Sequence, residues 1–137
     1  MLSDTRVVAT LPVSDLGRAK RFYADMLSLR PLRELPEGLL YECADGSRFL
    51  LYVTTGVPAS DHTQLAFVSS DLESEVADLK SDGVVFEEYD SPNLKTVHSI
   101  AYTQSGESAW FHDSEGNLLA LNQRDEDQAF KRSPAPS

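Results

Sequence analysis

The sequence predicts an α+β protein built from two copies of one βαβββ unit. Three observations support this prediction. Two amphipathic stretches begin in the same way, with Ser-Asp-Leu within residues 13–16 and again within residues 69–72. Short strand-like runs follow each stretch. Each copy then closes on a glycine turn that leads into an apolar run, at residues 45–52 and 115–121. Repeated units of this size normally pack around a shared cleft, so the repeat also predicts where a site lies.

The first copy, residues 5–55, contains a strand, a helix and three further strands. Alternating side chains predict a strand over residues 6–13. Apolar residues at helical spacing then predict a helix that either Ser14 or Asp15 caps. The three following strands are expected over residues 30–35, 39–43 and 48–54, separated by turn-forming residues.

The second copy, residues 62–123, repeats this order after a connector rich in Gly, Pro and Ser. Ser70 and Glu73 fit a capping box at the start of its helix, which ends near Gly83. The segment from residue 89 to residue 108 is longer than in the first copy and could form a lid or a pocket wall. Residues 124–137 are polar and are expected to form a frayed tail. Strands are expected over residues 64–68, 84–89, 97–103, 108–111 and 118–123.

The composition favours a globular protein and argues against several other classes of protein. A chain of 137 residues fits one domain, and its 41% hydrophobic content is typical of globular proteins. The net charge of −10 argues against binding to nucleic acid. Its apolar runs are too short to cross a bilayer, and no secretory signal is visible at the start. The single cysteine, Cys43, fits a reduced residue in a cytoplasmic protein.

Three stretches of the sequence carry a family resemblance. They are residues 11–16 with the helix behind them, residues 65–72, and residues 109–118, where Ser114 replaces a usual proline. On these stretches the chain resembles the vicinal oxygen chelate superfamily, which includes glyoxalase I, extradiol dioxygenases and the fosfomycin- and bleomycin-resistance proteins. The resemblance covers about residues 5–123. It implies one glyoxalase-like domain whose two modules form a curved mixed-sheet half-barrel around a central cleft, with the helices outside.

The resemblance also implies where a metal ion would bind. In metal-using members, four side chains meet in the cleft, and their places here fall on Val8, Leu50, Gln64 and Ala120. Catalytic zinc generally takes three protein ligands, yet three of these residues have no donor atom and the amide of Gln64 is a weak neutral ligand. A shift of one residue in the alignment supplies no donor either. We therefore expect neither a metal nor another cofactor.

Period-two alternation along the strands predicts which side chains line the cleft. They describe an apolar pocket with a few hydrogen-bonding groups, which is the usual composition of a small-molecule site. A filled core without a cavity is the alternative interpretation. No residue is assigned a catalytic role. The three histidines are scattered along the chain and are expected to be surface or hydrogen-bonded residues and not metal ligands. The expected ligand-binding residues are Val8, Thr10, Leu50, Tyr52, Gln64, Tyr102, Trp110, Ala120 and Asn122.

Three functions are compatible with this pattern. The leading hypothesis is a protein that binds a small organic molecule without metal, similar to bleomycin-resistance proteins that hold a cationic drug unaltered. The alternative is an enzyme of the same superfamily, either a metal-dependent lactoylglutathione lyase or dioxygenase, or a metal-free isomerase or lyase. The third is an accessory domain that acts through an oligomer interface. The resemblance further implies a homodimer, and we expect no nucleic-acid or membrane partner.

Overall fold

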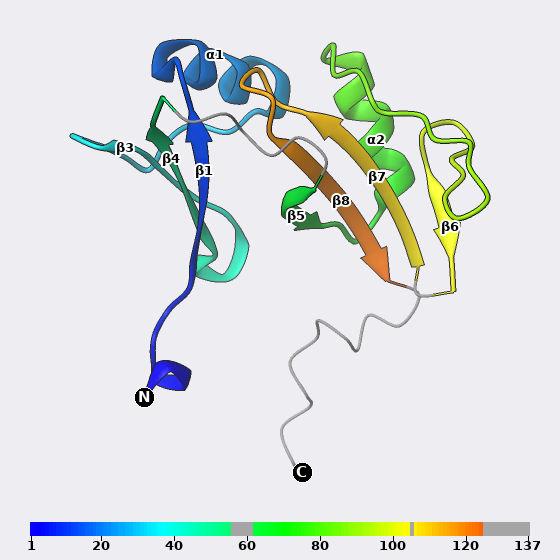
Figure 1. Ribbon diagram of the computed structural model, residues 1–137, viewed down its shortest axis with the longest axis horizontal. Coiled ribbons are helices and arrows are strands. Elements are labelled where there is room, and N and C mark those ends of the chain that lie inside the picture. Colours follow the sequence, from blue (N-terminus) through cyan, green and yellow to red (C-terminus); the bar gives the residue numbers. More distant parts are fainter. Residues whose placement is uncertain (56–61, 105, 125–137) are drawn as a thin grey trace. The chain divides into compact units, whose positions relative to one another are not determined.

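The computed structural model describes residues 1–55, 62–104 and 106–124, which form two compact units (Figure 1). Unit 1 comprises Met1–Leu65 and His112–Leu118, and unit 2 comprises Ala66–Phe111 and the described residues from Leu119 onward. The units therefore differ from the two sequence halves, because a short turn of the second half belongs to unit 1. The connector at residues 56–61 and the tail beyond residue 124 lie outside the described residues.

Unit 1 contains the first βαβββ module. Its main elements are β1 (Val8–Val13), α1 (Leu16–Leu27), β2 (Arg33–Leu35), β3 (Gly38–Glu42) and β4 (Arg48–Val53), and short 3-10 helices lie at Leu2–Asp4 and Ala44–Gly46. The strands form sheet A in the order β1-β4-β3-β2. β1 is parallel to β4, and the other neighbours are antiparallel. This arrangement confirms the predicted element order of the first half.

The core of unit 1 lies between α1 and sheet A. Asp15 caps the helix, since its carboxylate accepts from the Arg18 amide at 3.0 Å. The helix buries Ala19 and Tyr23 against the sheet, where Leu11 and Leu51 are also fully buried. One face of sheet A is therefore covered by its own helix.

The second sheet, sheet B, repeats the same strand order as β5-β8-β7-β6. Its elements are β5 (Thr63–Val68), α2 (Leu72–Ser81), β6 (Ala101–Thr103), β7 (Gly106–His112) and β8 (Leu118–Arg124). In unit 2, α2 buries Leu72 and Val76, while Phe86 packs edge-on against Phe111 at 5.4 Å. The predicted α+β class with two βαβββ modules is thus confirmed.

Two predicted strands of the second half are shorter than expected. Residues 84–89 form no strand and contribute only an isolated bridge between Phe86 and Phe111. The strand predicted over residues 97–103 is reduced to β6, because His98 and Ser99 have positive φ angles of 52° and 75°. These two residues turn the chain back so that Val97 bridges to Ile100, which ends any extended run there.

The predicted capping box of α2 is wrong by one residue. Asp71 is the cap, and its carboxylate accepts from the Ser74 amide at 3.3 Å. Ser69 supports this start, since its hydroxyl accepts from the Asp71 amide at 3.1 Å. Asp71 therefore occupies the same position in the second module as Asp15 does in the first, and the two helices begin with equivalent caps.

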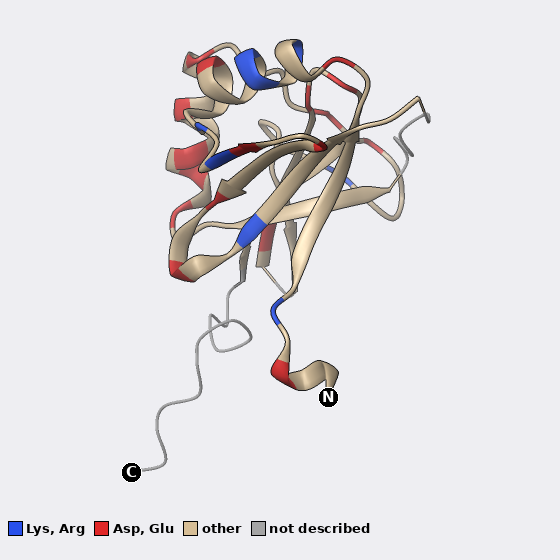
Figure 2. Ribbon diagram, turned by 90° about the vertical axis from the view of Figure 1, so that its left-hand side faces the viewer, with Lys and Arg blue, Asp and Glu red and all other residues tan. Residues whose placement is uncertain are grey.

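Acidic and basic residues are distributed along both helices and the loops of the described chain (Figure 2). On α2, acidic residues occupy the first turn, with Glu73 and Glu75, and Lys80 occupies the last turn. This order suits the helix dipole, which favours anions at the amino end and cations at the carboxyl end. Neither α1 nor α2, with 12 and 10 residues, is long and apolar enough to cross a membrane.

Candidate functional site

Sheet A has a second face, which points away from α1. Residues directly opposite one another on paired strands share a face, and faces alternate along each strand. Leu51 pairs with Leu11 on one side and with Leu39 on the other, and all three side chains are buried on the helix side. Their sequence neighbours are Leu50 and its two partners, Thr10 and Leu40. These three side chains therefore lie on the other side of the sheet. We call this surface the open face; it comprises Val8, Thr10, Pro12, Leu40, Glu42, Arg48, Leu50 and Tyr52.

None of these eight side chains is buried. Four of the predicted ligand-binding residues, Val8, Thr10, Leu50 and Tyr52, therefore share one partly accessible surface. Val8, on the edge strand β1, is 43% exposed. The open face thus combines aliphatic side chains with a phenol and a hydroxyl group, as the alternation of the sequence predicted.

The open face also carries an ion pair that the sequence reasoning missed. Arg48 lies opposite Glu42, and its Nη2 and Nε atoms lie 2.9 and 3.1 Å from the same carboxylate oxygen, Oε2. The two side chains remain 33% and 35% exposed. The two residues flank the turn between β3 and β4, so a hairpin register drawn through that turn could have revealed the pair.

The four residues that the family resemblance assigns to a metal ion do not suit that role. Val8 and Leu50 lie on the open face and offer no donor atom, and Ala120 is 2% exposed and equally unable to bind a cation. Gln64 offers one neutral oxygen. Elsewhere in the described residues, no three His, Cys, Asp or Glu side chains gather in a way that could hold a metal. His62 and His98 are exposed, as expected, and His112 is half-buried.

The side-chain amide of Gln64 has an unusual environment. Its side-chain oxygen Oε1 is buried and has no hydrogen-bond partner. Such atoms are rare in folded proteins, because burying an acceptor without a donor costs about 1–3 kcal/mol. Gln64 is the second residue of β5 and belongs to unit 1.

In unit 2, the corresponding face of sheet B carries three more predicted residues. Gln123 accepts from the first amide of α2, at Leu72, so alternation places Ala120 and Asn122 on the face away from that helix. Asn122 Oδ1 accepts from the Ser108 hydroxyl at 2.9 Å, and Trp110 follows Ser108 on the same face of β7. The Trp110 ring meets Tyr89 edge-on at 5.5 Å.

Tyr102 does not share this face. It lies opposite Glu107 on β7, one residue out of phase with Ser108 and Trp110. Its hydroxyl donates to Glu73 on α2 at 3.4 Å, which places the side chain on the helix side of sheet B. The structure therefore separates Tyr102 from Trp110, and we leave Tyr102 out of the binding surface proposed below.

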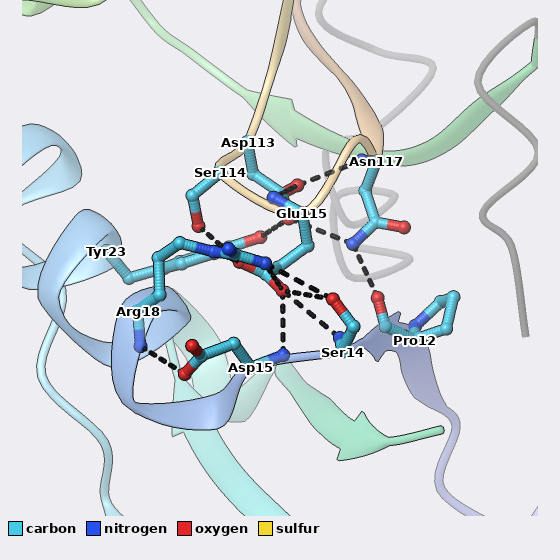
Figure 3. Close-up of polar contacts among 9 residues, drawn as sticks. All are labelled: Pro12, Ser14, Asp15, Arg18, Tyr23, Asp113, Ser114, Glu115 and Asn117. Carbon is cyan, nitrogen blue, oxygen red and sulfur yellow. Dashed lines mark hydrogen bonds and ion pairs between the residues drawn. The ribbon is translucent and has the colours of Figure 1, made fainter. Parts of the chain in front are cut away.

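The third resemblance stretch forms a structural turn within unit 1 (Figure 3). We call residues 112–118 the closing turn. Glu115 Oε1 accepts from the backbone amides of Ser14 and Asp15 at 3.1 and 3.0 Å, and Oε2 accepts from Arg18 Nε at 2.7 Å. The Glu115 side chain has no exposed surface. Burial alone would raise its pKa, but the hydrogen bonds from Arg18 and from the two amides outweigh burial and lower the pKa to about 2.

Asp113 organises the other half of the closing turn. Its Oδ1 accepts from the amides of Glu115 and Asn117 at 2.9 Å, and its Oδ2 accepts from the Tyr23 hydroxyl at 2.7 Å. Asn117 Nδ2 donates to the same carboxylate and to the Pro12 carbonyl, both at 2.9 Å. Burial, followed by the charge of Asp113, raises the pKa of Tyr23. These carboxylates are occupied by internal donors, so the closing turn joins β1 and α1 and is not a reactive site.

The sheet orders and the two repeated modules define the fold, and solved structures of glyoxalase/bleomycin resistance/dioxygenase proteins share it. No protein-family model matches the chain, and no curated protein matches it.

Solved structures with the same fold include both binding proteins and metal-containing proteins. TnmS3, an antibiotic binding protein from Streptomyces sp. CB03234, is 21% identical, with a TM-score of 0.61 over 89% of this chain and 98% of that chain. A glyoxalase/bleomycin resistance protein/dioxygenase from Alicyclobacillus acidocaldarius is 16% identical, with a TM-score of 0.66 over 93% and 97%. A mutant of the fosfomycin resistance protein FosX from Listeria monocytogenes, complexed with Mn(II), is 18% identical, with a TM-score of 0.66 over 96% and 100%. At these identities the likeness shows the fold.

Proposed function

We propose that the protein binds a small organic molecule on the open face, without a metal ion and without altering the molecule. The observation that carries this proposal is the chemistry of the four metal-site positions. Val8, Leu50 and Ala120 cannot bind a cation, and Gln64 alone offers a weak neutral donor. The same aliphatic side chains favour an apolar ligand, because covering them removes apolar surface from water.

The composition of the open face supports a ligand of this kind. Small-molecule sites are mostly apolar with a few placed polar groups, and here Leu50 and Val8 adjoin Tyr52 and Thr10. The proposed binding residues are Val8, Thr10, Leu50 and Tyr52 on the open face. Among the solved structures with this fold, TnmS3 is an antibiotic binding protein, which supports binding as a use of the fold.

Two measurements on the purified full-length protein test the proposal. We expect far less than one equivalent of Zn, Ni, Mn or Fe by elemental analysis, and a rise in the unfolding temperature with some members of a library of aromatic and cationic compounds. Mass spectrometry of the bound compound should recover it unchanged. One equivalent of metal that is required for activity, or conversion of the compound, would instead assign the protein to the enzymes of this fold.

A charge on the open face provides the matching mutational test. Leu50→Lys should weaken binding of a compound found in that screen by at least about tenfold, because the apolar contact is replaced by a solvated ammonium group. Val85→Lys is the control, since Val85 is 80% exposed and lies in unit 2 outside the proposed surface. Equal binding by the two variants would contradict the proposed location.

The proposal includes a cytoplasmic homodimer. The single, half-buried Cys43 suits a reducing compartment, and proteins of this superfamily often pair. Light scattering should then give twice the chain mass of 15.1 kDa.

A further inference from the structure

The open face carries a feature that a purely apolar binding surface would not need, the ion pair of Arg48 with Glu42. Both contacts of the guanidinium, from Nη2 at 2.9 Å and from Nε at 3.1 Å, end on the same oxygen, Glu42 Oε2. Neither contact uses Arg48 Nη1 or Glu42 Oε1. The two side chains are 33% and 35% exposed, so the pair still has N–H donors and a carboxylate oxygen to offer to a further partner.

The repeat shows that a hairpin of this kind closes without an ion pair. In each module a backbone N–H···O bond closes the turn, at 2.8 Å over residues 43–47 and at 2.9 Å over residues 113–117. The residues that flank the second turn are His112 and Leu118, and a leucine cannot form an ion pair. Exposed ion pairs also contribute little to stability. The pair on the open face is therefore not explained by the closure of its hairpin.

The ion pair lies next to the apolar part of the open face. On β4, Leu50 follows Arg48 by two residues, and on β3, Leu40 precedes Glu42 by two residues. Leu40 lies opposite Leu50, just as Glu42 lies opposite Arg48. Two residues of a strand span roughly 7 Å. A small aromatic molecule that covers the two leucines therefore also reaches the ion pair.

The pair disfavours three classes of ligand. An apolar molecule would remove water from both charges and return no hydrogen bond. An anion drawn to Arg48 would meet the carboxylate of Glu42, and a cation drawn to Glu42 would meet the guanidinium, because the two groups are only 2.9 Å apart. Arg33 lies opposite Leu40 on the edge strand β2, about 10 Å from β4, where physiological salt largely screens an exposed charge. A neutral group that donates and accepts side by side meets none of these costs.

We propose that the Arg48–Glu42 pair determines ligand specificity on the open face by binding a neutral group that both donates and accepts, such as a carboxamide. The carbonyl oxygen of this group accepts from the Arg48 guanidinium, and its N–H donates to the Glu42 carboxylate. The ligand is then a neutral amide, lactam or urea attached to an apolar body. This inference rests on the proposed function, because it concerns the ligand of that same surface.

Four small aromatic probes of similar size test the inference: benzamide, benzoate, benzamidine and toluene. Their binding to the isotope-labelled full-length protein is measured by NMR titration. We expect benzamide to bind at least about fivefold more tightly than each of the other three, which corresponds to one hydrogen bond. Benzamide that binds no more tightly than toluene or either charged probe would overturn the inference, and this result needs no variant.

Three variants change the charge of the pair and should change the order of the probes. Glu42→Leu leaves the guanidinium alone and should make benzoate the tightest probe, whereas Arg48→Leu leaves the carboxylate alone and should make benzamidine the tightest. The double variant, with both substitutions, should favour toluene, because the surface is then apolar. A preference for benzamide that persists in the double variant would contradict a role of the pair in recognition.

The ion pair of Lys20 with Glu34 provides the matched control. It joins α1 to β2 at 2.9 Å, and Glu34 lies opposite the buried Leu39 on the helix side of the same sheet. Glu34→Leu should therefore keep the order of the four probes, and a shift towards benzoate as large as that in Glu42→Leu would overturn the inference. Equal binding of all four probes to the natural protein would overturn the inference but leave the proposed function standing. If no probe perturbs the amides of β4, the proposed function itself fails.

Discussion

Two buried tyrosines of unit 1 differ in the hydrogen bonding of their hydroxyl groups. Tyr23 and Tyr41 are both fully buried, and their ring centroids lie 5.5 Å apart in a cluster that includes Phe49. The Tyr23 hydroxyl donates to Asp113, whereas the Tyr41 hydroxyl is buried without a partner. Burial, followed by the charge of Glu34, raises the pKa of Tyr41 to about 12. The same atom therefore has opposite consequences for stability at the two positions.

This contrast predicts opposite effects of one substitution. Tyr41→Phe should raise the free energy of unfolding by about 1 kcal/mol, because it removes a buried polar group that has no partner. Tyr23→Phe should lower it by about 1–3 kcal/mol, because Asp113 loses a donor inside the core. Urea unfolding followed by circular dichroism measures both. A similar loss in the two variants would show that Tyr41 has a hydrogen-bond partner in solution.

At the scale of elements, the two candidate caps of α2 predict a second pair of effects. Asp71→Ala should lower the free energy of unfolding by about 1 kcal/mol, because the α2 amides lose their acceptor and the helix dipole loses a nearby anion. Ser70→Ala should change it by less than about 0.5 kcal/mol, since Ser70 is exposed and is not the cap. Thermal unfolding of the two variants checks this, and a larger loss for Ser70→Ala would restore the capping box.

Local pattern predicted the elements well wherever a helix or strand has one buried face. The period of α1 and the alternation of β1 and β4 placed Val8, Thr10, Leu50 and Tyr52 on one surface. Pattern failed where the backbone turns without glycine or proline, as at His98 and Ser99. Tyr102 was expected to line the cleft because of its ring and not from strand alternation, and a three-residue strand has too few alternations to show on which side of the sheet it lies.

At the scale of the whole molecule, the closing turn could not be assigned from its sequence alone. Residues 109–118 were recognisable as a motif, but their partners lie about a hundred residues earlier, as Glu115 and Ser14 do. The periodicity of a short segment cannot reveal a contact between residues so far apart in the sequence. The turn belongs to unit 1, so a segment from the second half of the sequence contributes to the stability of the first.

The pKa of Glu115 makes this dependence measurable. Its folded pKa of about 2 lies below the ordinary value of 4.5, so its contribution to stability is fully present above pH 4.5 and is lost as the pH falls from there towards 2. The shift corresponds to at most about 3 kcal/mol, reduced by solvent screening because the Arg18 side chain is half-exposed. Glu115→Gln should therefore lower the free energy of unfolding by about 2–3 kcal/mol at pH 7, and the difference from the natural protein should shrink towards pH 3.

The surface pair of Glu34 with Lys20 provides the matched control. Its side chains are 66% and 45% exposed, so Glu34→Gln should cost less than about 1 kcal/mol at either pH. Urea unfolding at pH 7, 5 and 3 measures both variants. A loss for Glu115→Gln that is as large at pH 3 as at pH 7 would mean that the glutamate acts through its shape and not through its charge. Then the closing turn would be held by packing and by the hydrogen bonds of Asn117, and the acid sensitivity of the protein would have to arise elsewhere.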